Sequence, residues 1–108
     1  MASEERIQKL QEMLANDPKD SFIRYALAME YVGLKNPSEA IEILNELVKS
    51  DPKYTPGFHQ LGILFGKMNK TEEAKKAYRK GIDVAASMGE TKEEKEMREE
   101  LEDLEDEW

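Results

Sequence analysis

The sequence predicts an all-α protein built as an α-solenoid of antiparallel helix pairs. Apolar residues recur at helical spacing in six segments, and no segment alternates apolar and polar residues as a strand would. Several residue types also recur at a fixed offset of 34 residues, a period typical of stacked helix pairs. The 108 residues suffice for one domain with one modest core.

The first three expected helices begin at recognisable N-cap residues. The first covers residues 3–16, with Ser3 as its expected N-cap. The second follows Asp20, and the third follows Asn36, with Pro37 in the first helical position, where a missing N–H costs nothing.

The last three expected helices have similar boundaries. Thr55 is the expected N-cap of the fourth, and the fifth runs from Thr71 to Gly89, a candidate left-handed C-cap. The sixth begins with an expected capping box at Thr91. Its apolar residues form one narrow stripe, suited to lying on a single neighbour: Met97, Leu101, Leu104 and Trp108.

The 34-residue offset links residues of the same character. The tripeptide Asp-Pro-Lys at residues 17–19 returns at residues 51–53. Large, small, aromatic and Ala positions follow at the same offset: Leu27 and Leu61, Ala28 and Gly62, Tyr31 and Phe65, Ala40 and Ala74, Leu10 and Leu44, and Leu44 and Tyr78. A helix that is apolar on two sides cannot bury both faces within one pair, so neighbouring pairs are expected to stack.

This pattern resembles that of the tetratricopeptide repeat (TPR) family. The family's succession of large, Leu, small, aromatic, Ala, aromatic and Pro positions is matched twice, by Arg24-Leu27-Ala28-Tyr31-Ala40-Leu44-Pro52 and by Phe58-Leu61-Gly62-Phe65-Ala74-Tyr78. Two positions depart from it. Arg24 stands where the family has a large apolar residue, and Ala86 replaces the closing Pro, which suggests a longer fifth helix.

The resemblance implies one TPR-like domain over residues 1–108, wound as a right-handed superhelix of six helices. Residues 3–17 would form an N-terminal half-repeat, residues 21–54 and 55–88 two full repeats, and residues 91–108 an acidic C-terminal capping helix.

The resemblance also implies a function, that of a non-catalytic protein–protein interaction scaffold. In this family the first helix of each pair lines a concave groove that holds a peptide or helix of another protein. Carried over position by position, the groove residues would be Phe22, Tyr25, Met29, Val32, Tyr54, His59, Ile63 and Lys67.

The expected ligand is mostly apolar, either an extended peptide or an amphipathic helix. TPR domains that hold a C-terminal carboxylate use Lys, Asn and Arg, whereas Tyr25, Met29, His59 and Gln60 stand at the corresponding positions here. The alternative is a homodimer or larger homo-oligomer, in which the apolar strip or the terminal helices pair with another copy.

Charge and composition exclude several other functions. Residues 92–108 contain 10 acidic and three basic side chains and hold nearly all of the formal net charge of −8, which disfavours nucleic-acid and membrane-surface binding. With no Cys and one His, no metal site is expected. No motif indicates a cofactor or a catalytic site, so we expect no enzyme, and a cytoplasmic location.

Overall fold

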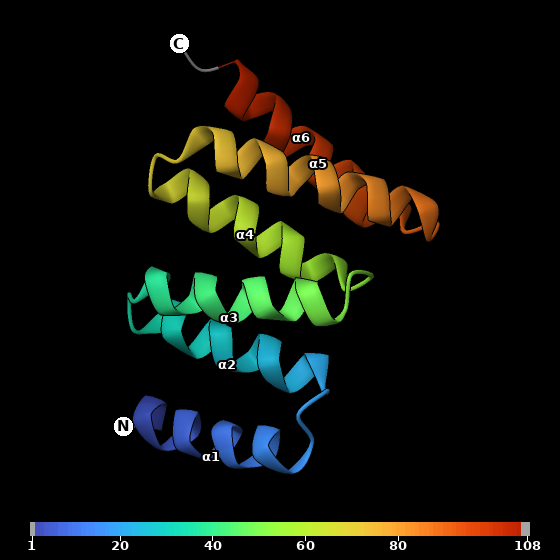
Figure 1. Ribbon diagram of the computed structural model, residues 1–108. Coiled ribbons are helices and arrows are strands. Elements are labelled where there is room, and N and C mark those ends of the chain that lie inside the picture. The colour runs from blue at the N-terminus through green and yellow to red at the C-terminus, as the bar shows by residue number, and fades with distance from the viewer. Residues whose placement is uncertain (1, 107–108) are drawn as a thin grey trace. The chain divides into compact units, whose positions relative to one another are not determined.

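The computed structural model describes residues 2–106, which contain six helices and no strand (Figure 1). The all-α prediction is therefore confirmed for this range. The helices are α1 (Ala2–Asn16), α2 (Ser21–Gly33), α3 (Pro37–Ser50), α4 (Thr55–Lys67), α5 (Thr71–Ser87) and α6 (Thr91–Glu105). The chain divides into two compact units, Met1–Asp51 and Pro52–Trp108. The expected place of Trp108 at the end of the apolar stripe lies outside the described residues.

The first unit consists of α1, α2 and α3, which run antiparallel in succession (Figure 1). The helix α2 packs against both of the others, as its two-sided apolar pattern predicts. The buried residues of this unit come from all three helices: Ile7, Ile23, Leu27, Ala28, Ala40, Leu44 and Leu47.

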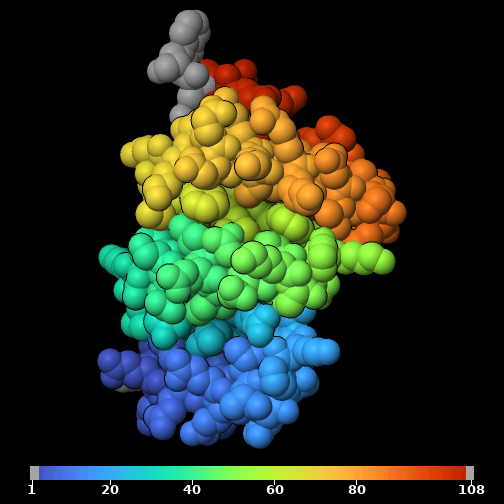
Figure 2. Space-filling model, in the orientation of Figure 1, coloured from blue at the N-terminus to red at the C-terminus, as the bar shows by residue number. Residues whose placement is uncertain are grey.

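The second unit consists of α4, α5 and α6, and α5 packs against both α4 and α6. On the face shown in Figure 2, side chains close the space between α4 and α5. A buried cluster of five residues from α5 and α6 forms part of its core: Ala74, Tyr78, Ile82, Ala85 and Met97. Leu61 of α4 is buried like Leu27 of α2, and each is the seventh residue of its helix, which confirms the predicted repeat.

Two predicted N-caps are confirmed, and both lie in the first unit. The Asp20 carboxylate accepts a hydrogen bond from the backbone N–H of Ile23 at 2.9 Å. The Asn36 side-chain oxygen accepts one from the N–H of Glu39 at 3.3 Å, and Pro37 is the first residue of α3. Each bond satisfies a donor that a helix N-terminus leaves without an intrahelical acceptor.

Three other expected N-caps are wrong. Ser3 lies inside α1, which already includes Ala2. Thr55 is the first residue of α4, after the N-cap Tyr54, and Thr91 is the first residue of α6. The Thr55 hydroxyl instead donates a hydrogen bond to the Glu90 carboxylate at 2.8 Å. The side chain expected to cap α4 therefore contacts a residue distant in sequence.

The predicted left-handed residue after the fifth helix is confirmed. Gly89 has a φ of +72°, which glycine adopts without a steric penalty. Two residues without this freedom, Lys35 and Asn69, have φ values of 60° and 61° in the turns after α2 and α4. As expected from the absence of the closing Pro, α5 is longer than α3, at 17 residues against 14.

Candidate functional site

In the first unit, the four predicted groove residues follow one another along α2 at helical spacing. Phe22, Tyr25, Met29 and Val32 recur every three or four residues and so share one side of the helix. The Phe22 side chain is 69% exposed, and the other three are half-buried. The core-facing side of the same helix is buried, so α2 is apolar on two sides.

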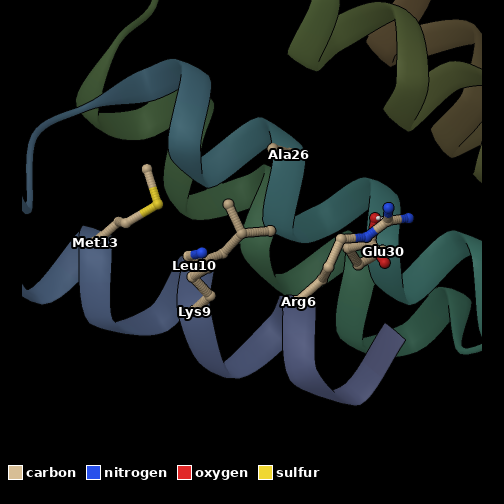
Figure 3. Close-up of a pocket in the computed structure, with 6 residues that line it drawn as sticks. All are labelled: Arg6, Lys9, Leu10, Met13, Ala26 and Glu30. Atoms are coloured by element: carbon tan, nitrogen blue, oxygen red, sulfur yellow. Dashed lines mark ion pairs between the residues drawn. The ribbon is translucent and has the colours of Figure 1, made fainter. Parts of the chain in front are cut away.

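A pocket of about 370 Å³ lies between α1 and α2 (Figure 3). Leu10 and Met13 point from α1 toward α2, and Ala26 contributes from α2. At one end Arg6 forms an ion pair with Glu30 at 3.2 Å, and Lys9 also lines the pocket. The pocket therefore has an apolar floor and a charged rim.

The departure at Arg24 has a structural reason in the first unit. One guanidinium nitrogen donates to the Ser50 hydroxyl at 2.9 Å, and the other donates to the Pro18 carbonyl at 2.8 Å. The Ser21 hydroxyl donates to Asp51 at 2.6 Å. These hydrogen bonds connect α2 to the turn that precedes it and to the C-terminal end of α3. A large apolar side chain at position 24 could not form the two bonds that Arg24 forms.

In the second unit, the other four predicted groove residues lie on or beside α4. Tyr54 is its half-buried N-cap residue, and Lys67 is its exposed last residue. Ile63 packs against the buried cluster of α5 and α6. His59 is half-buried, and its Nε2 lies 3.0 Å from both carboxylate oxygens of Glu100 on α6.

Glu100 connects all three helices of the second unit. Besides contacting His59 of α4, it accepts a hydrogen bond from the Tyr78 hydroxyl of α5 at 2.8 Å. The His59 and Tyr78 rings meet edge to face, with centroids 6.2 Å apart. Burial raises the pKa of Tyr78 above its ordinary value, and the hydrogen bond to Glu100 and its negative charge raise that pKa further.

Glu100 is the structural residue that the sequence analysis missed. Glu100 is one of the 10 acidic side chains of residues 92–108, which the sequence analysis considers only for their net charge. Its position nevertheless carried a signal, since it lies three residues after Met97 and four before Leu104, within the apolar stripe. A carboxylate inside such a stripe faces the neighbouring helices.

Two other kinds of site are absent from residues 2–106. No group of three or more His, Cys, Asp or Glu side chains in this range is arranged to hold a metal ion. None of the described helices has the length and hydropathy required to cross a bilayer.

A model of the tetratricopeptide repeat family matches residues 1–104. The chain belongs to the tetratricopeptide repeat family. The TPR repeat-containing protein PA0015 of Pseudomonas aeruginosa is 32% identical over 91 residues, covering 84% of this chain and 87% of that protein.

Solved structures confirm the TPR solenoid fold. A TPR domain protein from Salinibacter ruber is 36% identical with a TM-score of 0.78, over 82% of this chain and 89% of that one. The first TPR of Spaghetti (RPAP3), solved bound to the HSP90 peptide SRMEEVD, is 24% identical with a TM-score of 0.71, over 92% of this chain and 79% of that one.

Proposed function

We propose that this TPR protein is a non-catalytic interaction module that binds a peptide or helix of a partner protein. In the first unit the proposed binding residues are the four predicted on α2, and in the second unit they are the four on or beside α4. The observation that carries the proposal is Phe22, a large aromatic side chain that is 69% exposed, on the same side of α2 as Tyr25, Met29 and Val32. An exposed aromatic side chain beside partly exposed apolar residues on one helix side is typical of partner-binding surfaces.

The TPR family supports a role in protein binding, since the RPAP3 domain of this fold holds a peptide of HSP90. The chemistry of α2 and α4 in this chain favours a different ligand. Tyr25, Met29 and Gln60 supply no cation, and the Nε2 of His59 already contacts Glu100. We therefore propose a mostly apolar ligand, extended or helical. We also propose that the protein acts as a scaffold in the cytoplasm.

The experiment compares the wild-type protein with Phe22→Gln and Met29→Gln in capture from the native host, followed by mass spectrometry. A captured partner is then titrated by calorimetry against each variant. We expect at least a tenfold loss of affinity for both variants, because each removes apolar contact area from the α2 surface.

The matched control is Met88→Gln, which changes an apolar residue that is 44% exposed, lies just after α5 and is not among the predicted groove residues. It should bind like the wild type, and all variants should keep the wild-type helical circular dichroism. Unchanged affinity in both α2 variants would remove the groove from the proposal. A loss of self-association instead of partner binding, seen by light scattering, would favour the homo-oligomer.

A further inference from the structure

The internal repeat makes α1 and α2 of the first unit equivalent to α5 and α6 of the second. Leu10 and Tyr78 are two 34-residue periods apart, with Leu44 between them. Glu30 of α2 and Glu100 of α6 are each the tenth residue of their helices, although the 70 residues between them exceed two periods by two. Each glutamate contacts the preceding helix, through Arg6 of α1 in one unit and Tyr78 of α5 in the other.

In the second unit a third helix, α4, covers this pair. Gly62 lies against the Tyr78 ring, so that a Cβ there would be 2.7 Å from ring carbons. A Cβ at Gly81 of α5 would be 2.9 Å from the Phe58 Cβ of α4 and 2.6 Å from the Met97 sulfur of α6. The carboxylate of Glu100 faces His59 of α4. The face formed by α5 and α6 is thus a binding surface for an amphipathic helix, and here the chain itself supplies that helix.

In the first unit the equivalent residues line the open pocket of Figure 3. By the 34-residue period, Leu10 corresponds to Tyr78 and Met13 to Gly81, the two α5 residues that α4 covers. Met13 is 44% exposed. Arg6 and Lys9 correspond to the buried Ala74 and Ala77, so this surface carries two cations, of which Arg6 is paired with Glu30, where its counterpart carries methyl groups. We call the six lining residues the pocket surface: Arg6, Lys9, Leu10, Met13, Ala26 and Glu30.

We propose that the pocket surface binds an amphipathic helix of a partner protein, in the position that α4 takes against α5 and α6. The partner helix directs a bulky apolar side chain at Leu10 and Met13, as α4 directs Phe58 at its neighbour. Its acidic side chains face Lys9 and compete with Glu30 for Arg6, and this charge complementarity distinguishes it from the apolar ligand of the groove. The pocket surface shares no residue with the proposed groove.

The terminal helix of a second copy is a poor occupant, although its acidic charge would suit the two cations. Phe58 and Gly62 are the fourth and eighth residues of α4, and they make its close contacts. The fourth and eighth residues of α6 are Glu94 and Arg98, which pair with each other at 2.9 Å. A helix with an ion pair at these positions has no apolar side chain to place on the apolar floor of the pocket. We therefore infer that the bound helix belongs to a different protein.

The test uses a stapled helical peptide that copies residues 55–70 with Phe65→Glu and Asn69→Glu. These two positions extend the Phe58–Gly62 side of the helix toward the end where Arg6 lies, because adjacent helices run antiparallel. The matched control peptide carries Lys at both positions. Binding to the full chain is measured by fluorescence anisotropy and located by amide chemical shifts. We expect the acidic peptide to bind at least tenfold more tightly than the basic one, with shifts centred on Leu10, Met13 and Ala26.

The second part of the experiment reverses a charge in the protein instead of the peptide. The variant Lys9→Glu should weaken the acidic peptide at least tenfold and strengthen the basic one, while Lys80→Glu on exposed α5 surface should change neither. Equal affinity of the two peptides, no binding of either, or shifts outside α1 and α2 would each overturn the proposal. So would a dimer, seen by light scattering, that Lys9→Glu dissociates, because a second copy would then occupy the pocket surface.

Discussion

Gly62 of α4 lies directly against the aromatic ring of Tyr78 of α5. A Cβ atom built at Gly62 would be 2.7 Å from two ring carbons, closer than real Cβ contacts come. The Tyr78 ring cannot retreat easily, because its hydroxyl is bonded to Glu100 and its side chain is buried. The small residue that the repeat places at this position is therefore required by the approach of the two helices.

Gly62→Ala should accordingly destabilise the protein, by about 1–3 kcal/mol, through overpacking. In an unconstrained helix the same change stabilises by up to about 1 kcal/mol. Gly66→Ala, in the same helix, supplies the control, since its Cβ would meet only a Leu104 methyl at 3.9 Å. We expect Gly66→Ala to be neutral or stabilising in urea unfolding. A stable Gly62→Ala would contradict the close packing described here.

We predict that the raised pKa of Tyr78 lowers the free energy of unfolding at alkaline pH. Burial, together with its bond to Glu100, raises its pKa in the folded state above the ordinary 10.0. As the pH rises above that value, the unfolded chain loses the phenolic proton while the folded protein keeps it, so the free energy of unfolding falls. We expect Tyr78→Phe to remove this part of the pH dependence. Absorbance at 295 nm should show a late-titrating tyrosine in the wild type that the variant lacks.

The sequence predicted those features of the fold that depend on local signals. Asp20 and Asn36 cap their helices as expected, and Gly89 has the left-handed conformation. The apolar spacing and the 34-residue offset placed Leu27 and Leu61 in equivalent buried positions. Each of these depends on residues within one or two turns, or on a pattern that repeats.

What the sequence did not reveal depends on partners distant along the chain. Thr55 looks like an N-cap, but its hydroxyl is bonded to Glu90, 35 residues away. Glu100 looks like surface charge until α4 and α5 bring His59 and Tyr78 to it. The groove residues were predicted from the positions that line the groove in the TPR family. Those positions do not show which intramolecular contacts the side chains form in this chain.

We predict that the N-cap hydrogen bond of α2 contributes measurably to the stability of the protein. Asp20→Ala removes the acceptor for the Ile23 N–H and should cost about 1 kcal/mol in urea unfolding. Asn36→Ala should cost less, because its bond to Glu39 is longer, at 3.3 Å against 2.9 Å. Lys19→Ala, an exposed neighbour of Asp20 outside the helix, is the control and should be nearly neutral. Equal stability of the Asp20 variant and this control would show that the cap bond contributes nothing.

We predict that Met97 largely determines how stably α6 packs against the other helices of the second unit. Its side chain is fully buried and lies in the cluster with Tyr78 and Ile82, so Met97→Ala should cost about 2–5 kcal/mol. Because Met97 is the only fully buried residue of α6 within residues 91–106, its loss should also speed hydrogen exchange along α6 more than along α4. Met88→Ala, at a position 44% exposed, should change neither quantity. Exchange that rises equally in all helices would mean that α6 unfolds only together with the rest of the chain.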